Sequence, residues 1–436
     1  MSFSPALSAY RLATRALEPL IPRLLDARVR KGKESDTRVD ERLGLPGRAR
    51  PDGPLIWIHG VSVGEALSIL PLAERIRKER PDVTVLVTTG TLTSAEVIQP
   101  RLPHGVIHQF APVDGPNAVA SFLDHWQPQL GIFVESELWP NMIMAARQRG
   151  IPLALVSARI TAKTEDGWKK APGMARQLLS AFDHVWPQDE EGHERLTRMG
   201  ARVEGQVNLK LSGEPLPYDR AEFSRLSALI GDRPVIVLAS THENEEQALS
   251  KVLRGLAPRL LLIVVPRHPN RAPDVAEELR RDGWRMTRRS VGGDIADDVD
   301  LYLADTLGEL GLFMRLADVV VMGGSFAPAL GGGTVGGHNP LEPARLAKPA
   351  ISGPDASNWQ QVNRILKQAG GLTTVLSHDH LPDEVRPLLE RPEQAQEMGH
   401  RARRAANEAA AGLDRLWGAL QAHLPDAPKT APRKPR

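Results

Sequence analysis

The sequence contains no cysteine, carries almost no net charge and has no apolar run long enough to span a membrane. Without cysteine the chain can form neither disulfides nor thiolate metal sites, and no thiol can act as a nucleophile. A formal net charge of +2 is too small for a general nucleic-acid-binding surface, so no nucleic-acid partner is expected. Arg11, Arg15 and Arg23 interrupt the N-terminal apolar residues well short of the ~20 residues that a spanning helix needs. Since no small-residue cleavage site follows, the sequence predicts neither a spanning helix nor a signal peptide.

The length of the chain favours two domains. At 436 residues it exceeds the size at which a single hydrophobic core usually stops growing. Two domains of roughly 200 residues each are therefore expected. Hydrophobic residues make up 41% of the sequence and charged residues 25%, which is typical of a folded globular protein. Each half can bury a core of its own.

The first 35 residues combine leucines with basic side chains. Their apolar members fall roughly on one stripe of a helix, beside several arginines. The stripe comprises Leu7, Tyr10, Leu17, Leu20, Ile21, Leu24 and Leu25. This pattern favours an amphipathic helix over 1–35 that lies on a membrane surface. A helix packed on its own domain explains the same residues and stays open as the alternative.

From residue 54 onward, short apolar runs alternate with helical patterns. The runs occupy 55–59, 83–88, 130–134 and 153–156, and then 234–239, 260–265, 301–304 and 319–322. Such alternation is typical of βα units on a parallel sheet. We therefore predict an α/β fold with two Rossmann-like doubly wound domains facing a cleft. Ligands of such domains bind at the carboxyl ends of the strands, where every motif described below falls.

Composition also indicates the domain boundaries. The Gly/Pro-rich polar segment 211–220 interrupts the alternation and predicts a linker. It separates a first domain at 36–210 from a second at 221–425, which ends in a C-terminal helix. The last residues, 426–436, are rich in proline and basic side chains, and they predict a disordered tail.

The first candidate site residue is Glu65. The strand at 55–59 leads into a glycine loop from Gly60 to Gly64 that opens a helix, so a substrate can approach the backbone closely. Ser62 and Glu65 have capping-box spacing, and from spacing alone a purely capping role for Glu65 is favoured. The loop lacks both the Gly-Lys-Ser/Thr of a Walker motif and the dinucleotide glycine pattern.

Two carboxylates follow the strand at 130–134. Glu135 and Glu137 stand at alternating positions beside Trp139. A pair of carboxylates is also used by hydrolases and by divalent metal sites. Neither interpretation is well supported, and the metal site in particular lacks an Asp-x-Asp or a histidine cluster nearby. A solvated strand end remains an equal alternative.

Cationic and polar residues end two strands of the second half. Arg267 and His268 lie between two prolines that keep the segment out of a helix, and Arg267 is well placed for a phosphate or a carboxylate. His268 alone is more often structural. Further along, Thr306 and Glu309 again have capping-box spacing before a helix.

The strongest local signal is a glycine-rich stretch over 323–337. It ends in Asn339, Pro340, Leu341 and Glu342, which suit the N-cap, N1, N2 and N3 positions of a helix. A phosphate at that helix N-terminus is stabilised by free N–H groups and the dipole, and Glu342 can accept from ribose hydroxyls. The alternative is a flexible loop with an ordinary cap.

Taken in order, eight motifs resemble the family of 3-deoxy-D-manno-octulosonic acid (Kdo) transferases over nearly the whole chain. They are GVSVGE, ESELWPN, GQVNLK, STHENEE, PRHP, DTLGEL, GGS and GGHNPLEPA. The resemblance implies an inverting glycosyltransferase of the GT-B type that uses CMP-Kdo as donor and needs no metal or other cofactor. It implies a lipid A precursor, lipid IVA, as acceptor in lipopolysaccharide biosynthesis. The protein is then expected at the cytoplasmic face of the inner membrane.

The resemblance also implies residue roles. Glu65 corresponds to the general base, and Glu135 to an acidic residue after the fourth strand, with Glu137 as the neighbour that could be confused with it. Lys210 corresponds to a family lysine. The CMP site corresponds to Arg267, His268, Leu307, Gly308, Glu309, Asn339, Pro340, Leu341 and Glu342.

The chain departs from the family pattern at three places. Leu307 replaces the usual methionine, the segment 160–170 lacks a Ser/Arg-rich pattern, and the loop 331–337 is expanded. These departures bear on acceptor fit and loop geometry more than on the reaction.

Three other functions are alternatives to Kdo transfer. An NAD(P)-dependent oxidoreductase shares twin α/β domains but requires Gly-x-Gly-x-x-Gly after its first strand, which is absent at Gly60. A non-catalytic membrane-attached nucleotide-binding protein would keep the second-half site without needing Glu65. Another GT-B sugar-nucleotide transferase with a lipid acceptor is the third alternative.

Overall fold

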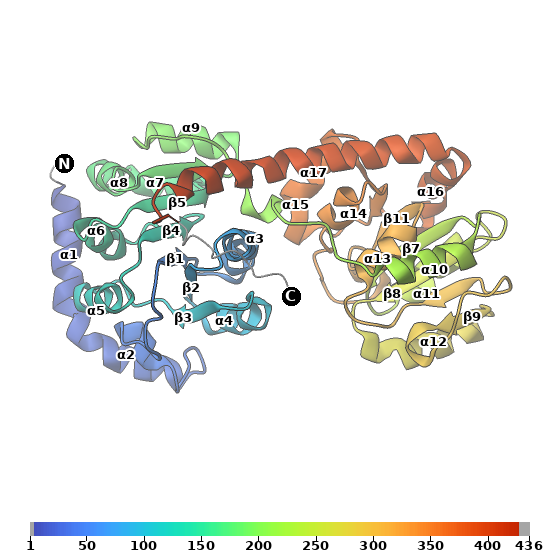
Figure 1. Ribbon diagram of the computed structural model, residues 1–436, viewed down its shortest axis with the longest axis horizontal. Helices are drawn as coiled ribbons and strands as arrows, with labels where there is room; N and C mark the ends of the chain where they lie inside the picture. The colour runs from blue at the N-terminus through green and yellow to red at the C-terminus, as the bar shows by residue number, and fades with distance from the viewer. Residues whose placement is uncertain (1–3, 427–436) are drawn as a thin grey trace, which may run out of the picture. The chain divides into compact units, whose positions relative to one another are not determined.

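The computed structural model describes residues 4–426, which divide into two compact units (Figure 1). The first unit takes the chain up to Gly213 and again from Ala409, and the second is Glu214–Glu408. Apart from Asp426, the predicted tail 426–436 lies outside the described residues. Each unit is described by itself.

The first unit contains a parallel sheet whose strands lie in the order β3-β2-β1-β4-β5-β6. Its strands are β1 (Leu55–His59), β2 (Thr84–Thr89), β3 (Val106–Phe110), β4 (Leu130–Val134), β5 (Leu153–Ala158) and β6 (His184–Pro187). Nearly every strand residue is buried, as is usual when helices cover both faces of a parallel sheet. The predicted strands at 55–59 and 130–134 are confirmed at both ends. β3 and β6 were not predicted, since β3 carries polar residues and the four residues of β6 begin with histidine and end with proline.

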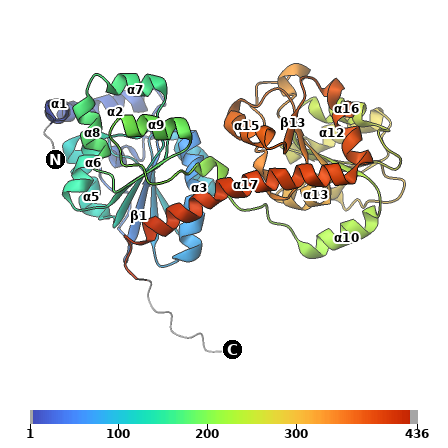
Figure 2. The same ribbon diagram turned by 90° about the horizontal axis from the view of Figure 1, so that it is seen from above.

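Helices cover both faces of this sheet. They are α3 (Val63–Glu79), α4 (Leu92–Ile98), α5 (Pro116–Trp126), α6 (Pro140–Gln148), α7 (Ala162–Trp168), α8 (Pro172–Leu179) and α9 (Glu190–Arg198). Along β1, Trp57 faces the core beneath α5, α6 and α8, whereas Ile56 and Ile58 face the core beneath α3. Figure 2 shows α5 and α6 on one side of the strands and α3 on the other.

The N-terminal segment forms α1 (Pro5–Leu17), a short 3-10 turn (Glu18–Leu20) and α2 (Ile21–Val29), instead of one helix over 1–35. Pro19 and Pro22 explain the interruption, because proline disrupts a continuous helical hydrogen-bond ladder. One face of α1 packs on the first unit: Leu7 is buried, and Tyr10 donates to Asp114 at 3.0 Å. No helix within 4–426 is both long enough and apolar enough to cross a membrane.

The second unit holds a parallel sheet in the order β13-β12-β11-β7-β8-β10-β9. Its strands are β7 (Val235–Thr241), β8 (Leu261–Pro266), β9 (Met286–Arg288), β10 (Leu301–Leu303), β11 (Val319–Met322), β12 (Ala350–Ser352) and β13 (Leu372–Thr374). Its helices are α10 (Arg220–Ile230), α11 (Glu245–Leu253), α12 (Ala272–Arg281), α13 (Leu310–Leu316), α14 (Leu341–Arg345), α15 (Gln360–Gln368) and α16 (Leu381–Glu390). Buried side chains of β7 alternate between a core with α11 and a core with α10 and α13. The predicted doubly wound α/β fold is thus confirmed in each unit.

The final helix, α17 (Pro392–Gln421), differs from the predicted arrangement in which it belongs to the second domain alone. Its residues from Ala409 onward belong to the first unit. Leu416, Trp417 and Leu420 are buried in the core beside α3, and the Trp417 indole donates to Glu79 at 2.6 Å. Apolar periodicity predicts a buried helical face but cannot tell which sheet it will cover, which is why the sequence misplaced this helix.

Candidate functional site

Glu65 lies in the first turn of α3, directly after β1 and its glycine loop. Its Oε2 accepts hydrogen bonds from the Val61 amide at 2.5 Å and the Ser62 amide at 3.1 Å, while Ser62 Oγ accepts from the Glu65 amide at 3.3 Å. The capping box expected from the spacing is therefore present. A side chain at Gly60 would meet Glu65 Cβ at 3.1 Å, so glycine there permits the turn to close over the strand end. The Glu65 side chain is held in one place by backbone donors.

Glu135 follows β4 with a left-handed backbone, at φ 62°. Such a conformation is uncommon for residues other than glycine and marks a position fixed by its surroundings. Lys210 Nζ lies 2.7 Å from Glu135 Oε1, as an ion pair that is not aligned as a hydrogen bond. Lys210 is brought there by a short 3-10 turn (Leu209–Leu211) whose amide at Lys210 donates to Asn208 Oδ1. The two residues predicted from the sequence are thus partners.

Glu137 turns to a different neighbour. The Trp139 indole donates to its carboxylate, and the Glu65 carboxyl lies within hydrogen-bond reach of it. Burial, followed by repulsion from Glu65, raises the pKa of Glu137 to about 7. Glu135 and Glu137 therefore differ in role as well as in position: one pairs with the lysine, and the other shares an acidic pocket with Glu65.

Sheet order explains why these four side chains meet. β1 pairs with β4, so the loops that leave their carboxyl ends, with Glu65 on one and Glu135 and Glu137 on the other, are neighbours. The chain after β6 returns to the same edge, where a side chain on Gly64 would touch Lys210 Nζ at 4.0 Å. Three carboxylates and one ammonium group form a cluster, which we call the carboxylate cluster: Glu65, Glu135, Glu137 and Lys210.

In the second unit, Arg267 and His268 follow β8 and are exposed. The Arg267 amide donates to the carbonyl of Thr241 at the end of β7, at 2.9 Å. The His268 ring stands edge-on to His242, with ring centroids 5.7 Å apart. His242 in turn contacts His338 of the glycine-rich loop, with Nε2 atoms 2.9 Å apart. We call these three imidazoles with Arg267 the histidine cluster.

Sequence reasoning gave no role to His242, His338 or Glu245, although all three lie in the motifs quoted above. Glu245 is fully buried, and its carboxylate accepts from the amides of His242, Gly324 and Phe326 at 2.7–2.9 Å. Burial raises the pKa of Glu245, while these amides act in the opposite direction. The carboxylate therefore joins the loops after β7 and β11. The sequence offered two signals for this contact: a glutamate soon after one buried strand and a pair of glycines directly after another.

The last glycine-rich motif departs slightly from its prediction. α14 begins at Leu341 and has five residues, so Asn339 is not the N-cap itself. Asn339 Oδ1 still accepts from the Leu341 amide at 3.1 Å. The Glu342 amide donates to the Asn339 carbonyl at 3.2 Å, a 3-10-type bond between residues three apart that precedes the helix. Burial raises the pKa of Glu342 to about 7, and Arg345 and Arg267 act in the opposite direction. Arg267 and Glu342 thus share one neighbourhood.

The segment after β10 is also arranged differently. The predicted capping box of Thr306 and Glu309 is absent: α13 begins at Leu310, and Glu309 precedes it without a side-chain cap. Gly308 has φ +83°, a left-handed conformation, so the α-helix cannot begin before this residue and Thr306 cannot serve as its N-cap. The Glu309 carboxylate instead pairs with Arg289 at 2.5 Å and accepts from the Thr306 hydroxyl. Leu307 is 81% exposed.

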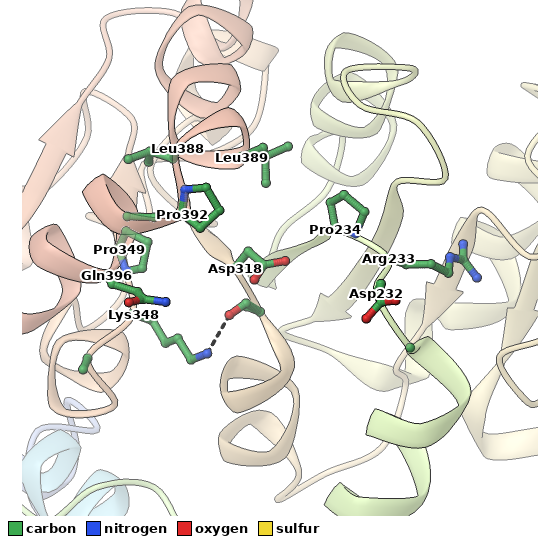
Figure 3. Close-up of a pocket in the computed structure, with 14 residues that line it drawn as sticks. Asp232, Arg233, Pro234, Asp318, Lys348, Pro349, Leu388, Leu389, Pro392 and Gln396 are labelled. Atoms are coloured by element: carbon green, nitrogen blue, oxygen red, sulfur yellow. Dashed lines mark hydrogen bonds between the residues drawn. The ribbon is translucent and has the colours of Figure 1, made fainter.

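A cavity of about 410 Å³ lies elsewhere in the second unit (Figure 3). Its lining includes Asp232 before β7, Asp318 before β11 and Lys348 before β12. It therefore opens at the amino ends of these strands, the edge opposite the histidine cluster, and the Lys348 amine is bound to the Ala317 carbonyl at 2.7 Å. Within residues 4–426, no group of three histidine, aspartate or glutamate side chains is arranged to hold a metal ion.

Comparisons with known proteins show which family this chain resembles. Residues 37–212 match the family model described as 3-deoxy-D-manno-octulosonic-acid transferase (kdotransferase). The 3-deoxy-D-manno-octulosonic acid transferase of Bordetella pertussis is 34% identical over 432 residues, covering 94% of this chain and 98% of that protein. A probable mitochondrial 3-deoxy-D-manno-octulosonic acid transferase of Arabidopsis thaliana is 33% identical, covering 95% of each.

A solved structure supports the fold alone. UDP-GlcNAc 2-epimerase from Neisseria meningitidis bound to UDP-GlcNAc matches with a TM-score of 0.51 at 13% identity, covering 85% of this chain and all of that one. The twin doubly wound units are those of a GT-B glycosyltransferase. With relatives above 30% identity along almost its entire length, the chain belongs to the 3-deoxy-D-manno-octulosonic acid transferase family.

Proposed function

We propose that this glycosyltransferase moves Kdo from CMP-Kdo to the lipid A precursor lipid IVA, in lipopolysaccharide biosynthesis at the cytoplasmic face of the inner membrane. The observation that carries the proposal is the carboxylate cluster, which stands at the carboxyl edge of the first sheet in a chain related to Kdo transferases along its length. That edge is where ligands of doubly wound sheets bind.

Glu65 acts as the general base. Its carboxylate takes the proton from the primary hydroxyl of the acceptor as that oxygen bonds to the anomeric carbon. The bond from the anomeric carbon to the phosphate oxygen breaks on the opposite face, its electron pair leaves with CMP, and one displacement inverts the centre. Two backbone donors on Oε2 orient the group. Glu137, whose pKa is raised to about 7, is partly protonated near neutral pH, which reduces its repulsion of Glu65.

Lys210 meets negative charge on the donor sugar. Its ammonium group is anchored by the buried Glu135 but keeps about a third of its surface exposed, at 36%. An anchored cation of this kind can balance the Kdo carboxylate or charge that develops during transfer. Glu135 thus fixes the position of Lys210 without touching the reacting atoms.

The nucleotide half of the donor binds at the carboxyl edge of the second sheet. Arg267, exposed and cationic, meets the phosphate, and Glu342 accepts from the ribose hydroxyls. Leu307, Gly308 and Glu309 border the same edge, and so do His268 and the turn from Asn339 to Leu341. No metal takes part in this scheme, so activity should survive a chelator; inactivation with rescue by a divalent ion would contradict it.

The acceptor is a lipid, so the enzyme must reach a membrane surface. Four leucines of the N-terminal helical segment are exposed: Leu12 at 71%, Leu17 at 59%, Leu20 at 53% and Leu24 at 60%. Arg15 and Arg23 are exposed in the same segment. Exposed leucines interspersed with arginines suit an anionic bilayer surface.

Mass spectrometry of the glycolipid product tests the proposal. The full chain is incubated with CMP-Kdo and lipid IVA, and we expect the glycolipid to gain the mass of one or more Kdo residues. The matched control is the Glu65→Gln variant, which should give little product. CMP binding without any product would instead favour a nucleotide-binding protein, and product only from another sugar nucleotide would favour a different transferase.

A further inference from the structure

The histidine cluster contains a contact that restricts its protonation. The Nε2 atoms of His242 and His338 lie 2.9 Å apart, and the two rings are nearly parallel, at 14°. At that distance one nitrogen donates its hydrogen and the other accepts it. If both carried a hydrogen at Nε2, two donors would face each other. With one hydrogen between the two rings, at most one of the two imidazoles can be an imidazolium, so this contact allows the pair to carry no more than one positive charge.

The surroundings of the pair are cationic. His242 faces His268 and lies near Arg267 and Arg271, and His338 also lies near Arg267 and His268. Burial, followed by these neighbours, lowers the pKa of His338 to about 4 and lowers that of His242 as well. Glu245, a carboxylate of the same loops, is already bonded to three backbone amides. Without a ligand, little counter-charge favours a proton on the pair.

The pair joins the loops that border the proposed nucleotide site. His242 follows β7, Arg267 and His268 follow β8, and His338 immediately precedes Asn339. His338 packs over Gly324, where an added side chain would come within 2.9 Å of its ring. Both imidazoles are partly exposed. An anion bound beside Arg267 would therefore lie next to two rings able to accept a proton.

We propose that the pair of His242 and His338 takes up a proton when the donor's phosphate binds, so that an imidazolium faces the phosphate as CMP departs. This inference rests on the proposed function. When the bond from sugar to phosphate breaks, its electron pair stays on the phosphate oxygen, and a monoanionic diester becomes a dianionic monoester. The proton comes from solvent and adds one positive charge to the pair where one negative charge is gained on the phosphate.

Calorimetry can count that proton. CMP is titrated into the full chain at about pH 7.5 in buffers of different ionisation enthalpy; there free CMP is largely dianionic, since the second pKa of a phosphate monoester is about 6. We expect net uptake of a fraction of one proton. His242→Gln and His338→Gln should lose most of the uptake and weaken CMP binding roughly tenfold, as loss of a charged hydrogen bond does.

Two matched controls sharpen the result. His400→Gln alters an exposed histidine on α17 and should keep the full uptake. Cytidine, which lacks the phosphate, should bind without uptake. Histidine NMR titrations of the unmodified chain give a measurement that does not depend on the variants folding: CMP should raise the pKa of two imidazoles. CMP binding without proton uptake would overturn this inference alone, whereas no CMP binding would overturn the proposed donor with it.

Discussion

Lys210 Nζ lies 2.7 Å from Glu135 Oε1, and the two partners differ sharply in burial, with side-chain exposures of 36% and 7%. We expect Lys210→Met to destabilise the chain more than Glu135→Gln, because it leaves a buried carboxylate without its cation. A double-mutant cycle measured by chemical denaturation should give a coupling free energy of roughly 0.5–3 kcal/mol. Strictly additive effects would mean that the contact contributes nothing in solution.

Replacing the proposed base should affect turnover and leave the donor site intact. Glu65→Gln is expected to lower the transfer rate roughly 10²–10⁴-fold while CMP affinity stays unchanged. Because Glu65 also closes a capping box, Ser62→Ala is the matched control: it removes the cap at a cost of about 1 kcal/mol but keeps the carboxylate. A Glu65→Gln enzyme that retains more than about a tenth of the rate would assign the proton transfer to another residue.

Glu137 should make stability depend on pH. Its pKa is raised from 4.5 to about 7, so between these values the folded chain keeps a proton that the unfolded chain releases. The free energy of unfolding therefore falls as pH rises through this window and levels off above it. Glu137→Gln mimics the protonated form and does not titrate. The difference in free energy of unfolding between this variant and the unmodified chain should therefore shift in favour of the variant by on the order of 1 kcal/mol when the pH is raised from about 4.5 to about 8. Glu96→Gln, at an exposed position, serves as the control. If the stability difference between Glu137→Gln and the unmodified chain were the same at both pH values, the raised pKa of Glu137 would be refuted.

The two donor-site residues should differ in their effect on CMP binding. Arg267→Ala is expected to weaken the affinity roughly 10–100-fold, since it removes a charged partner of the phosphate. Glu342 is proposed to meet neutral hydroxyls, so Glu342→Ala should weaken CMP binding by roughly tenfold or less. Arg254→Ala, which removes a guanidinium stacked on Trp284, is a control of similar size. Unchanged affinity in Arg267→Ala, measured by calorimetry, would exclude it from the phosphate site.

The exposed leucines predict how the chain meets lipid. Replacing Leu17, Leu20 and Leu24 with serine should reduce binding to anionic vesicles more than about tenfold, because each removes apolar area from the contact. High salt should loosen the unmodified chain only partly, and transfer to a detergent-dispersed acceptor should persist. Vesicle flotation measures this binding. The control is the double variant Val291→Ser with Leu376→Ser, which removes exposed apolar side chains of the second unit and should leave vesicle binding unchanged. A triple variant that still floats, or that loses thermal stability, would favour a purely structural helix.

The sequence predicted the central strands well because they are continuous apolar runs. β1 and β4 were located to the residue. β9, β12 and β13 have three residues each and include polar ones, so they carry too little pattern to be recognised, whereas the equally short but apolar β10 was found. α17 shows a second limit, since its periodicity identified a buried face but not the sheet that it covers.

The site shows a similar division. Glu65, Glu135 and Lys210 were named from motifs, and sheet order brings them together. The left-handed backbone that directs Glu135 to Lys210, and leaves Glu137 beside Glu65, depends on tertiary contacts that spacing does not encode. The histidine pair depends on a contact across 96 positions of the chain, and no local pattern could reveal it.

The position of α17 sets an order for synthesis. The core beside α3 contains Val207 and Leu209, on the segment that carries Lys210, together with Leu416 and Trp417 near the end of α17. A ribosome releases the chain from its N-terminus, at about 5–20 residues per second, so the second unit emerges before the side chains that complete the first. The part of this core that α17 covers must therefore remain exposed during much of translation, and the lysine segment gains its final packing only when the last helix has emerged.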